Sequence, residues 1–174
     1  MPHWNKAIIA APVKTTGDLM SDIRAVLEGV ADIARERGVF GNVELGSDTL
    51  RCQAKESTAE AWYHVQREGN GWCVSLSTAD RWLSESIEAD LMHAGDSMEE
   101  LIEEELVDLG GEGPVAAPKH FRADDRSYVF RSHVPQVDER RNASAERATH
   151  IALWLLAYEA AFRNLGDMAG SREE

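Results

Sequence analysis

The segment at residues 61–77, AWYHVQREGNGWCVSLS, contains the pattern that decides the fold. Two runs rich in aromatic and β-branched residues, Ala61–Arg67 and Trp72–Ser77, flank the triplet GNG at 69–71. Glycine and asparagine readily adopt the positive φ angles that tight hairpin turns require. We therefore predict two antiparallel strands joined by a short turn.

The residues before this hairpin extend the same sheet. Val43 and Leu45 precede a turn-forming Gly-Ser-Asp triplet, and residues 50–54 then alternate apolar with polar side chains. An alternation of period two is typical of a half-buried strand. The sequence thus predicts a meander of antiparallel strands. A second hairpin is expected at 119–123 and 127–134, with its turn at Asp-Asp-Arg.

Helical spacing of apolar residues frames the strands. Residues 18–37 have this spacing, with Asp18 as the expected N-cap and Gly38 as the C-terminal stop. Residues 80–93 also fit a strand that continues the run SLSTADRWLS, but we favour a helix. A second acidic helix should follow, opened by a capping box of Asp96 and Glu99.

The predicted order is one helix, three or more strands, the acidic helices, two strands and a long last helix at 143–165. We abbreviate it α-β-β-β-α-β-β-α. Segregated helices and hairpins indicate an α+β fold, with a twisted antiparallel sheet and helices packed on one face. A ferredoxin-like arrangement is the alternative. We expect a single domain over 1–174, in which residues 1–16 form a loosely held N-terminal arm.

Negative charge is concentrated in the middle of the chain. Twelve acidic residues and one arginine fall between Asp80 and Glu112, which gives 11 of the 13 net negative charges. Such a segment repels nucleic-acid phosphates and anionic lipid, so we expect neither nucleic acid nor a membrane as a partner. A basic protein or peptide is the expected partner. The residues proposed to bind it are Glu99, Glu100, Glu103 and Glu104.

The last helix is apolar on more than one side. Leu153, Trp154, Leu156, Tyr158 and Phe162 point in several directions around a helical wheel. A helix that is apolar on more than one side has to bury more than one side. Either the helix at 18–37 covers the second side, as core packing, or a second copy of the chain does. We expect a homodimer.

Catalytic and metal-binding patterns are missing from the sequence. It contains no nucleophile elbow, phosphate-binding loop or dinucleotide fingerprint, so we predict that the protein is not an enzyme and has no cofactor. Asp90 and His93 have the i, i+3 spacing of a helical metal-ligand pair, but no second pair exists, and we expect no metal. Cys52 and Cys73 are interpreted as buried reduced thiols. No stretch is long and apolar enough to span a bilayer, and we expect a cytoplasmic protein.

The element order, small size and acidity, together with the strand at 128–132 and the segment LLAYEAAFRNLGDM at Leu155–Met168, resemble the YbjN-like and type III secretion chaperone-like proteins. The likeness covers Asp18–Met168. It implies helices on a twisted antiparallel sheet, frequent homodimerisation, and binding of a polypeptide without chemistry. The leading hypothesis is thus a non-catalytic, chaperone-like or regulatory protein-binding module. The alternative is a small-ligand-binding protein or an enzyme whose site forms only in three dimensions.

Overall fold

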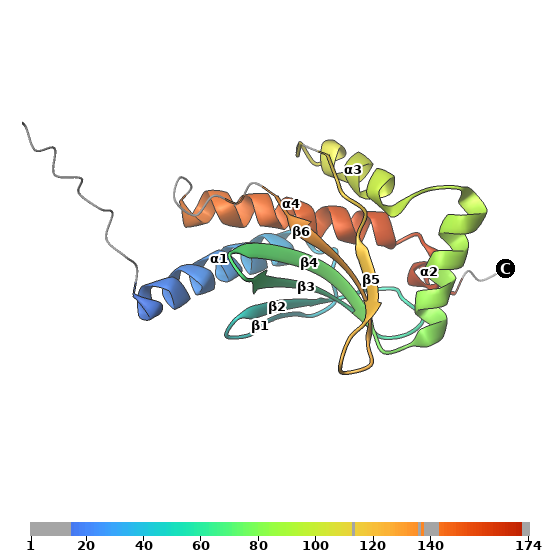
Figure 1. Cartoon of the computed structure of the whole chain (residues 1–174), viewed down its shortest axis with the longest axis horizontal. Helices are drawn as coiled ribbons and strands as arrows, with labels where there is room; N and C mark the ends of the chain where they lie inside the picture. The colour runs from blue at the N-terminus through green and yellow to red at the C-terminus, as the bar shows by residue number, and fades with distance from the viewer. Residues whose placement is uncertain (1–14, 113, 136, 138–142, 172–174) are drawn as a thin grey trace, which may run out of the picture.

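The computed structural model describes residues 15–112, 114–135, 137 and 143–171. It has the predicted α+β architecture, with a six-stranded antiparallel sheet and helices packed on one side of it (Figure 1). In chain order the elements are α1 (Thr16–Arg37), β1 (Val43–Leu45), β2 (Thr49–Gln53), β3 (Ala61–Glu68), β4 (Gly71–Thr78), α2 (Arg81–Ala94), α3 (Met98–Asp108), β5 (Lys119–Arg122), β6 (Tyr128–Val134), α4 (Ser144–Phe162) and the 3₁₀-helix η1 (Gly166–Ala169).

The strands lie in the order β1-β2-β3-β4-β6-β5, and every neighbouring pair is antiparallel. Both predicted hairpins are present, and Val43–Leu45 forms a separate strand, so four strands precede the acidic helices. The ferredoxin-like alternative is wrong, because that fold is built from split βαβ units and β1 to β4 follow one another without a helix. Residues 80–93 are helical, as favoured above.

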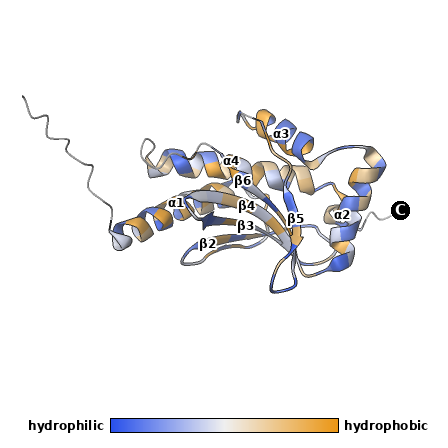
Figure 2. Ribbon diagram, viewed as in Figure 1, coloured by the Kyte–Doolittle hydropathy of each residue, from blue (hydrophilic) through white to orange (hydrophobic). Residues whose placement is uncertain are grey.

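The core lies between the sheet and the pair of helices α1 and α4, which run side by side behind the strands in Figure 1. The inward residues of β3, Tyr63 and Val65, alternate with half-buried ones, and α1 contributes Val26, Leu27 and Val30. Figure 2 shows hydrophobic and hydrophilic residues interleaved along α1, as an amphipathic helix requires. The first possibility for α4 therefore holds, because α1 covers its second side within the chain.

Several predicted helix boundaries need correction. The Thr15 hydroxyl, not Asp18, caps α1 by accepting a hydrogen bond from the Asp18 amide at 3.2 Å. Thr15 and Thr16 thus belong to the helix start, and the rest of the predicted arm, 1–14, lies outside the described residues. The last helix ends at Phe162, because the backbone leaves the α-conformation and turns into η1 at Gly166, whose φ is 49°.

The capping box of α3 is formed by Ser97 and Glu100, one residue later than predicted. The Ser97 hydroxyl accepts from the Glu100 amide at 3.3 Å, and the Glu100 carboxylate accepts from the Ser97 amide at 3.4 Å. This register buries Met98, Ile102 and Leu106 against the rest of the molecule. Helix α3 packs on α4, and α2 packs on η1.

Candidate functional site

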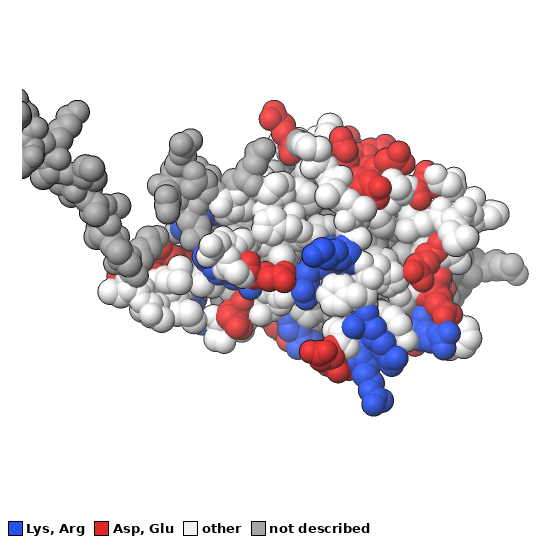
Figure 3. Space-filling view, viewed as in Figure 1, with Lys and Arg blue, Asp and Glu red and all other residues white. Residues whose placement is uncertain are grey.

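The predicted acidic residues lie on an exposed face of α3. Glu100, Glu103 and Glu104 are exposed, Glu99 is half-buried, and none of the four forms an ion pair with a residue that the structure describes. The positions 100, 103, 104 and 107 fall on one side of a helix. We call this face, made of Glu100, Glu103, Glu104 and Val107, the acidic surface. Acidic side chains gather over α3 and α2 in Figure 3.

Exposed apolar side chains accompany this charge. Val107 is 59% exposed within the acidic surface, and on the neighbouring helix α2 Trp82 is 74% and Met92 is 85% exposed. The described residues contain four exposed large hydrophobic side chains, and three of them are these. Single exposed apolar residues are ordinary on proteins, and Val107 is distinguished from them by its position among the carboxylates of the acidic surface.

The residues predicted for core packing or dimerisation lie inside the chain. Trp154, Leu156, Tyr158 and Phe162 are buried and Leu153 is half-buried, because α4 is enclosed by the sheet, α1 and α3. The Tyr158 hydroxyl donates a hydrogen bond to Ser132 Oγ on β6. These contacts correspond to core packing. Homodimerisation stays a prediction.

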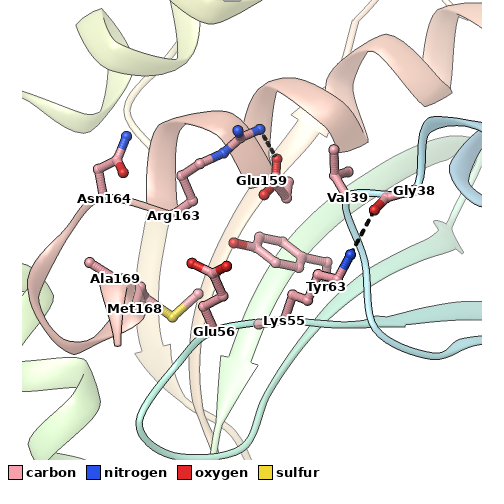
Figure 4. Close-up of a pocket in the computed structure, with 11 residues that line it drawn as sticks. Gly38, Val39, Lys55, Glu56, Tyr63, Glu159, Arg163, Asn164, Met168 and Ala169 are labelled. Carbon is pink, nitrogen blue, oxygen red and sulfur yellow. Dashed lines mark hydrogen bonds and ion pairs between the residues drawn. The ribbon is translucent and has the colours of Figure 1, made fainter. Parts of the chain in front are cut away.

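A pocket of about 210 Å³ lies between the end of α4, η1, the β2–β3 loop and the residues that follow α1. We call it the Tyr63 pocket (Figure 4). Its polar lining consists of Lys55, Glu56, Tyr63, Glu159, Arg163 and Asn164, and its apolar lining includes Val39, Ala54 and Met168. The charged groups come from distant parts of the sequence, so their convergence depends on α4 packing against β3.

Glu159 is the most deeply placed charge of the Tyr63 pocket. It is 8% exposed, on a helix whose other inward residues are apolar except Tyr158 and Arg147, and it forms an ion pair with Arg163 one turn later. Burial raises the pKa of the Glu159 carboxyl, and the Arg163 guanidinium counteracts part of this rise. The carboxylates of Glu105 and Glu56 raise it further. Helix α3 therefore contributes to the electrostatics of this pocket through Glu105.

The Tyr63 side chain is 1% exposed, and its hydroxyl points into the pocket in Figure 4. Burial and the nearby Glu159 raise the pKa of Tyr63 well above its ordinary value, so the phenol is protonated at neutral pH. The hydrogen bonds among the residues drawn join Arg163 to Glu159 and Lys55 to Gly38, and neither involves Tyr63. The pocket thus presents an unused phenol beside a buried carboxylate.

A second cavity, of about 370 Å³, is lined by residues of β4 and β6, by Lys119 at the start of β5 and by the two alanines at 116–117 that precede it. Cys73 lines it and donates its thiol proton to Glu68 Oε2 at 3.0 Å, with His133 Nδ1 4.0 Å from the sulfur. Burial, followed by the contact with Glu68, raises the pKa of the Cys73 thiol to about 12. Because only the thiolate is a strong nucleophile, this Cys–His neighbour pair is not an activated one.

The predicted thiols and the weighed metal pair have structural roles. Cys52 and Cys73 are both buried and free, as predicted, and β3 separates their strands. The Asp90 carboxylate accepts a hydrogen bond from the Gly166 amide at 2.9 Å, which anchors η1 to α2. Neither Asp90 nor His93 belongs to a group of three potential metal ligands in the described part of the chain. Among the described helices, none combines the length and apolar character that crossing a bilayer requires.

Sequence reasoning missed the Tyr63 pocket. The signal that could have found it is Glu159, a single carboxylate directly after the uninterrupted apolar run at 151–158, with Arg163 four residues later. A carboxylate on a helix that must bury several sides faces desolvation, and such groups concentrate at functional sites. Tyr63 carried no such signal, since a tyrosine in a strand is an ordinary core residue. Comparisons with protein-family models, curated proteins and solved structures give no match to this chain.

Proposed function

We propose that this protein is a non-catalytic binding module that engages a basic, amphipathic polypeptide through the acidic surface and exposed apolar residues of α2. The observation that carries the proposal is the placement of Val107, 59% exposed, among glutamates without a basic partner in the described chain. A surface needed only for solubility gains nothing from an exposed valine, methionine and tryptophan. A surface for protein contact needs both charge and apolar area.

The charge and the apolar side chains have separate roles in this proposal. The carboxylates accelerate encounter with a cationic partner, and this effect weakens with ionic strength. Val107, Met92 and Trp82 supply the area that leaves water on binding and sets the dissociation rate. An amphipathic helix with basic residues on one side and apolar residues on the other has the complementary pattern.

The sequence resemblance to YbjN-like and type III secretion chaperone-like proteins supports the same class of function. We extend the proposal to a chaperone-like or regulatory role and to a homodimer, as that resemblance implies. We place this function in the cytoplasm, where two free buried cysteines are the expected state.

The test uses a fluorescently labelled helical peptide of lysine and leucine, with fluorescence anisotropy as the readout. In the first variant, Glu100, Glu103 and Glu104 are changed to lysine, and in the second Val107 is changed to serine. The lysine variant should raise the Kd about tenfold or more and flatten its salt dependence. The serine variant should weaken binding with the salt dependence unchanged. Circular dichroism checks that both remain folded.

The matched control reverses three exposed acids on α1, Glu28, Asp32 and Glu36, to lysine. This variant has the same change in net charge as the first. It should retain most of the affinity, because its charges lie on another helix. If the two triple variants lose the same affinity, binding depends only on the net charge of the protein, and the acidic surface is not the binding site.

A further inference from the structure

The Tyr63 pocket combines three features that together specify a ligand. Its least exposed polar residues are Tyr63, which is 1% exposed, and Glu159, which is 8% exposed. The Tyr63 hydroxyl points into the cavity and has no hydrogen-bond partner among the described residues, so it is available to a ligand or to ordered water. The Glu159 carboxylate accepts from Arg163 through Oε2, so Oε1 has no part in that contact.

The lining holds two bases and two acids, so its formal charge is balanced, and the groups that can still accept hydrogen bonds from a ligand are the acids. Glu56 makes no ion pair with a described residue, and Glu105 on α3 adds to the negative potential at Glu159. The two bases keep their positive charge, but their donors are directed elsewhere, since Lys55 Nζ donates to the Gly38 carbonyl at 3.1 Å and Arg163 contacts Glu159. Burial is the main cause of the raised pKa of this carboxyl, with Glu105 and Glu56 adding to it, and a cation bound beside Glu159 would counteract both effects.

We propose that the Tyr63 pocket binds a primary ammonium group carried on an apolar stem. An ammonium donates three hydrogen bonds, which matches the acceptors offered by Tyr63, Glu159 and Glu56. The stem lies against Val39, Ala54 and Met168. A metal ion is a poorer occupant, because the described residues hold no group of three potential metal ligands. The volume of about 210 Å³ suits a ligand smaller than those of ordinary small-molecule sites.

The ammonium has two possible sources, a free amine or the lysine side chain of a partner protein. Both present the same chemistry to Tyr63 and Glu159. The site does not depend on the acidic surface, since its contacts come from α4 and the β2–β3 region rather than from the exposed side of α3. The two proposals can therefore fail separately.

The experiment is isothermal titration calorimetry at about 0.15 M salt, which screens nonspecific attraction to the acidic chain. The probes are pentylamine, pentanol and pentanoate, which share one stem and differ in the head group, and N-acetyl-lysine-methylamide. Pentylamine should bind, and pentanol and pentanoate should bind about tenfold more weakly or not at all. Binding of the lysine derivative as tight as that of pentylamine assigns the site to a partner's lysine, and weaker binding assigns it to a free amine.

The variants test the named contacts. Glu159→Gln should weaken pentylamine binding about tenfold or more, Tyr63→Phe should weaken it severalfold, and Glu36→Gln on the exposed side of α1 should leave it unchanged. Glu56→Gln alters an exposed residue and keeps the test valid if a buried variant fails to fold. Equal binding of pentylamine and pentanol, undiminished binding by Glu159→Gln and Glu56→Gln, or no binding of any amine would each overturn the proposal.

Discussion

Replacement of Gly29 by alanine tests the closest approach between α1 and α4. A Cβ atom at position 29 would lie 2.7 Å from the Cβ of Ala148. Carbon atoms in contact are normally about 3.5–4.0 Å apart, so the two helices would have to separate by roughly 1 Å. Neither carbon is the end of a flexible side chain, and Ala148 is buried. The strain therefore falls on the packing of both helices.

The magnitude follows from two opposing effects. Alanine stabilises a helix interior by about 1 kcal/mol relative to glycine. Overpacking a well-filled core costs about 1–3 kcal/mol, and a rigid backbone-attached contact places this site in the upper part of that range. We expect Gly29→Ala to lower the free energy of unfolding by about 1–2 kcal/mol, the difference of these two effects.

The assay is equilibrium unfolding in urea, followed by circular dichroism. Gly17→Ala is the matched control in the same helix, because a Cβ there would meet no atom closer than 3.9 Å. It should leave stability unchanged or raise it. Adding Ala148→Gly to Gly29→Ala moves the methyl group across the interface and should recover part of the loss. If Gly29→Ala stabilises the protein as much as Gly17→Ala does, the close packing of α1 on α4 is refuted.

The remaining predictions concern the pocket, the thiols and the cap of α3. Burial raises the pKa of Glu159 in the folded protein above the unfolded value of about 4.3, so folding favours the protonated carboxyl. The stability that this carboxyl contributes is therefore present below the unfolded pKa and is lost as the pH rises through the folded pKa. The stability of Glu159→Gln relative to the wild type should thus increase from acid to neutral pH in urea titrations, and a constant difference would contradict this. Cys52 and Cys73, each with a pKa raised to about 12 by burial, should resist a disulfide reagent in the native protein and react after unfolding. Ser97→Ala should lower stability by about 1 kcal/mol in thermal unfolding, and Asp96→Ala should have a smaller effect. A larger effect of Asp96→Ala than of Ser97→Ala would indicate that Asp96 is the N-cap, as predicted from the sequence.

The sheet was predictable because its signals are local. The alternation in β2 and β3 and the turn residues at 69–71 specify strands and their antiparallel pairing without knowledge of the rest of the chain. The apolar spacing of residues 80–93 predicted a helix, although the same residues were also compatible with a strand. In the structure Asp80 favours the helix, because its carboxylate accepts a hydrogen bond from the Leu83 amide at 2.8 Å and caps α2.

The cap of α3 shows why boundaries are harder to predict. Asp96 and Ser97 are both good N-cap residues, each followed three positions later by a glutamate. Local energies separate the two registers poorly. The packing of α3 on α4 selects Ser97, because that register buries Met98 and Ile102.

The Tyr63 pocket was not predictable for a different reason. Tyr63 and Glu159 lie on different elements, and nothing in their spacing along the chain indicates contact. Their proximity is a property of the whole fold, as is the enclosure that raises the pKa of Glu159. The acidic residues could be named from composition, whereas the exposed apolar residues could not, since the sequence alone does not show that Trp82 is exposed.

Strands β4 and β6 are hydrogen-bonded neighbours, although α2, α3 and β5 lie between them in the chain. The chain leaves the sheet after Thr78 and returns to it at Lys119, so 11 of the 13 net negative charges are carried on a segment whose two ends are fixed in the sheet. Because α3 packs on α4 and α2 packs on η1, only the outward faces of this segment can change charge without disturbing the core. Partner specificity can therefore diversify on those faces while the architecture is kept.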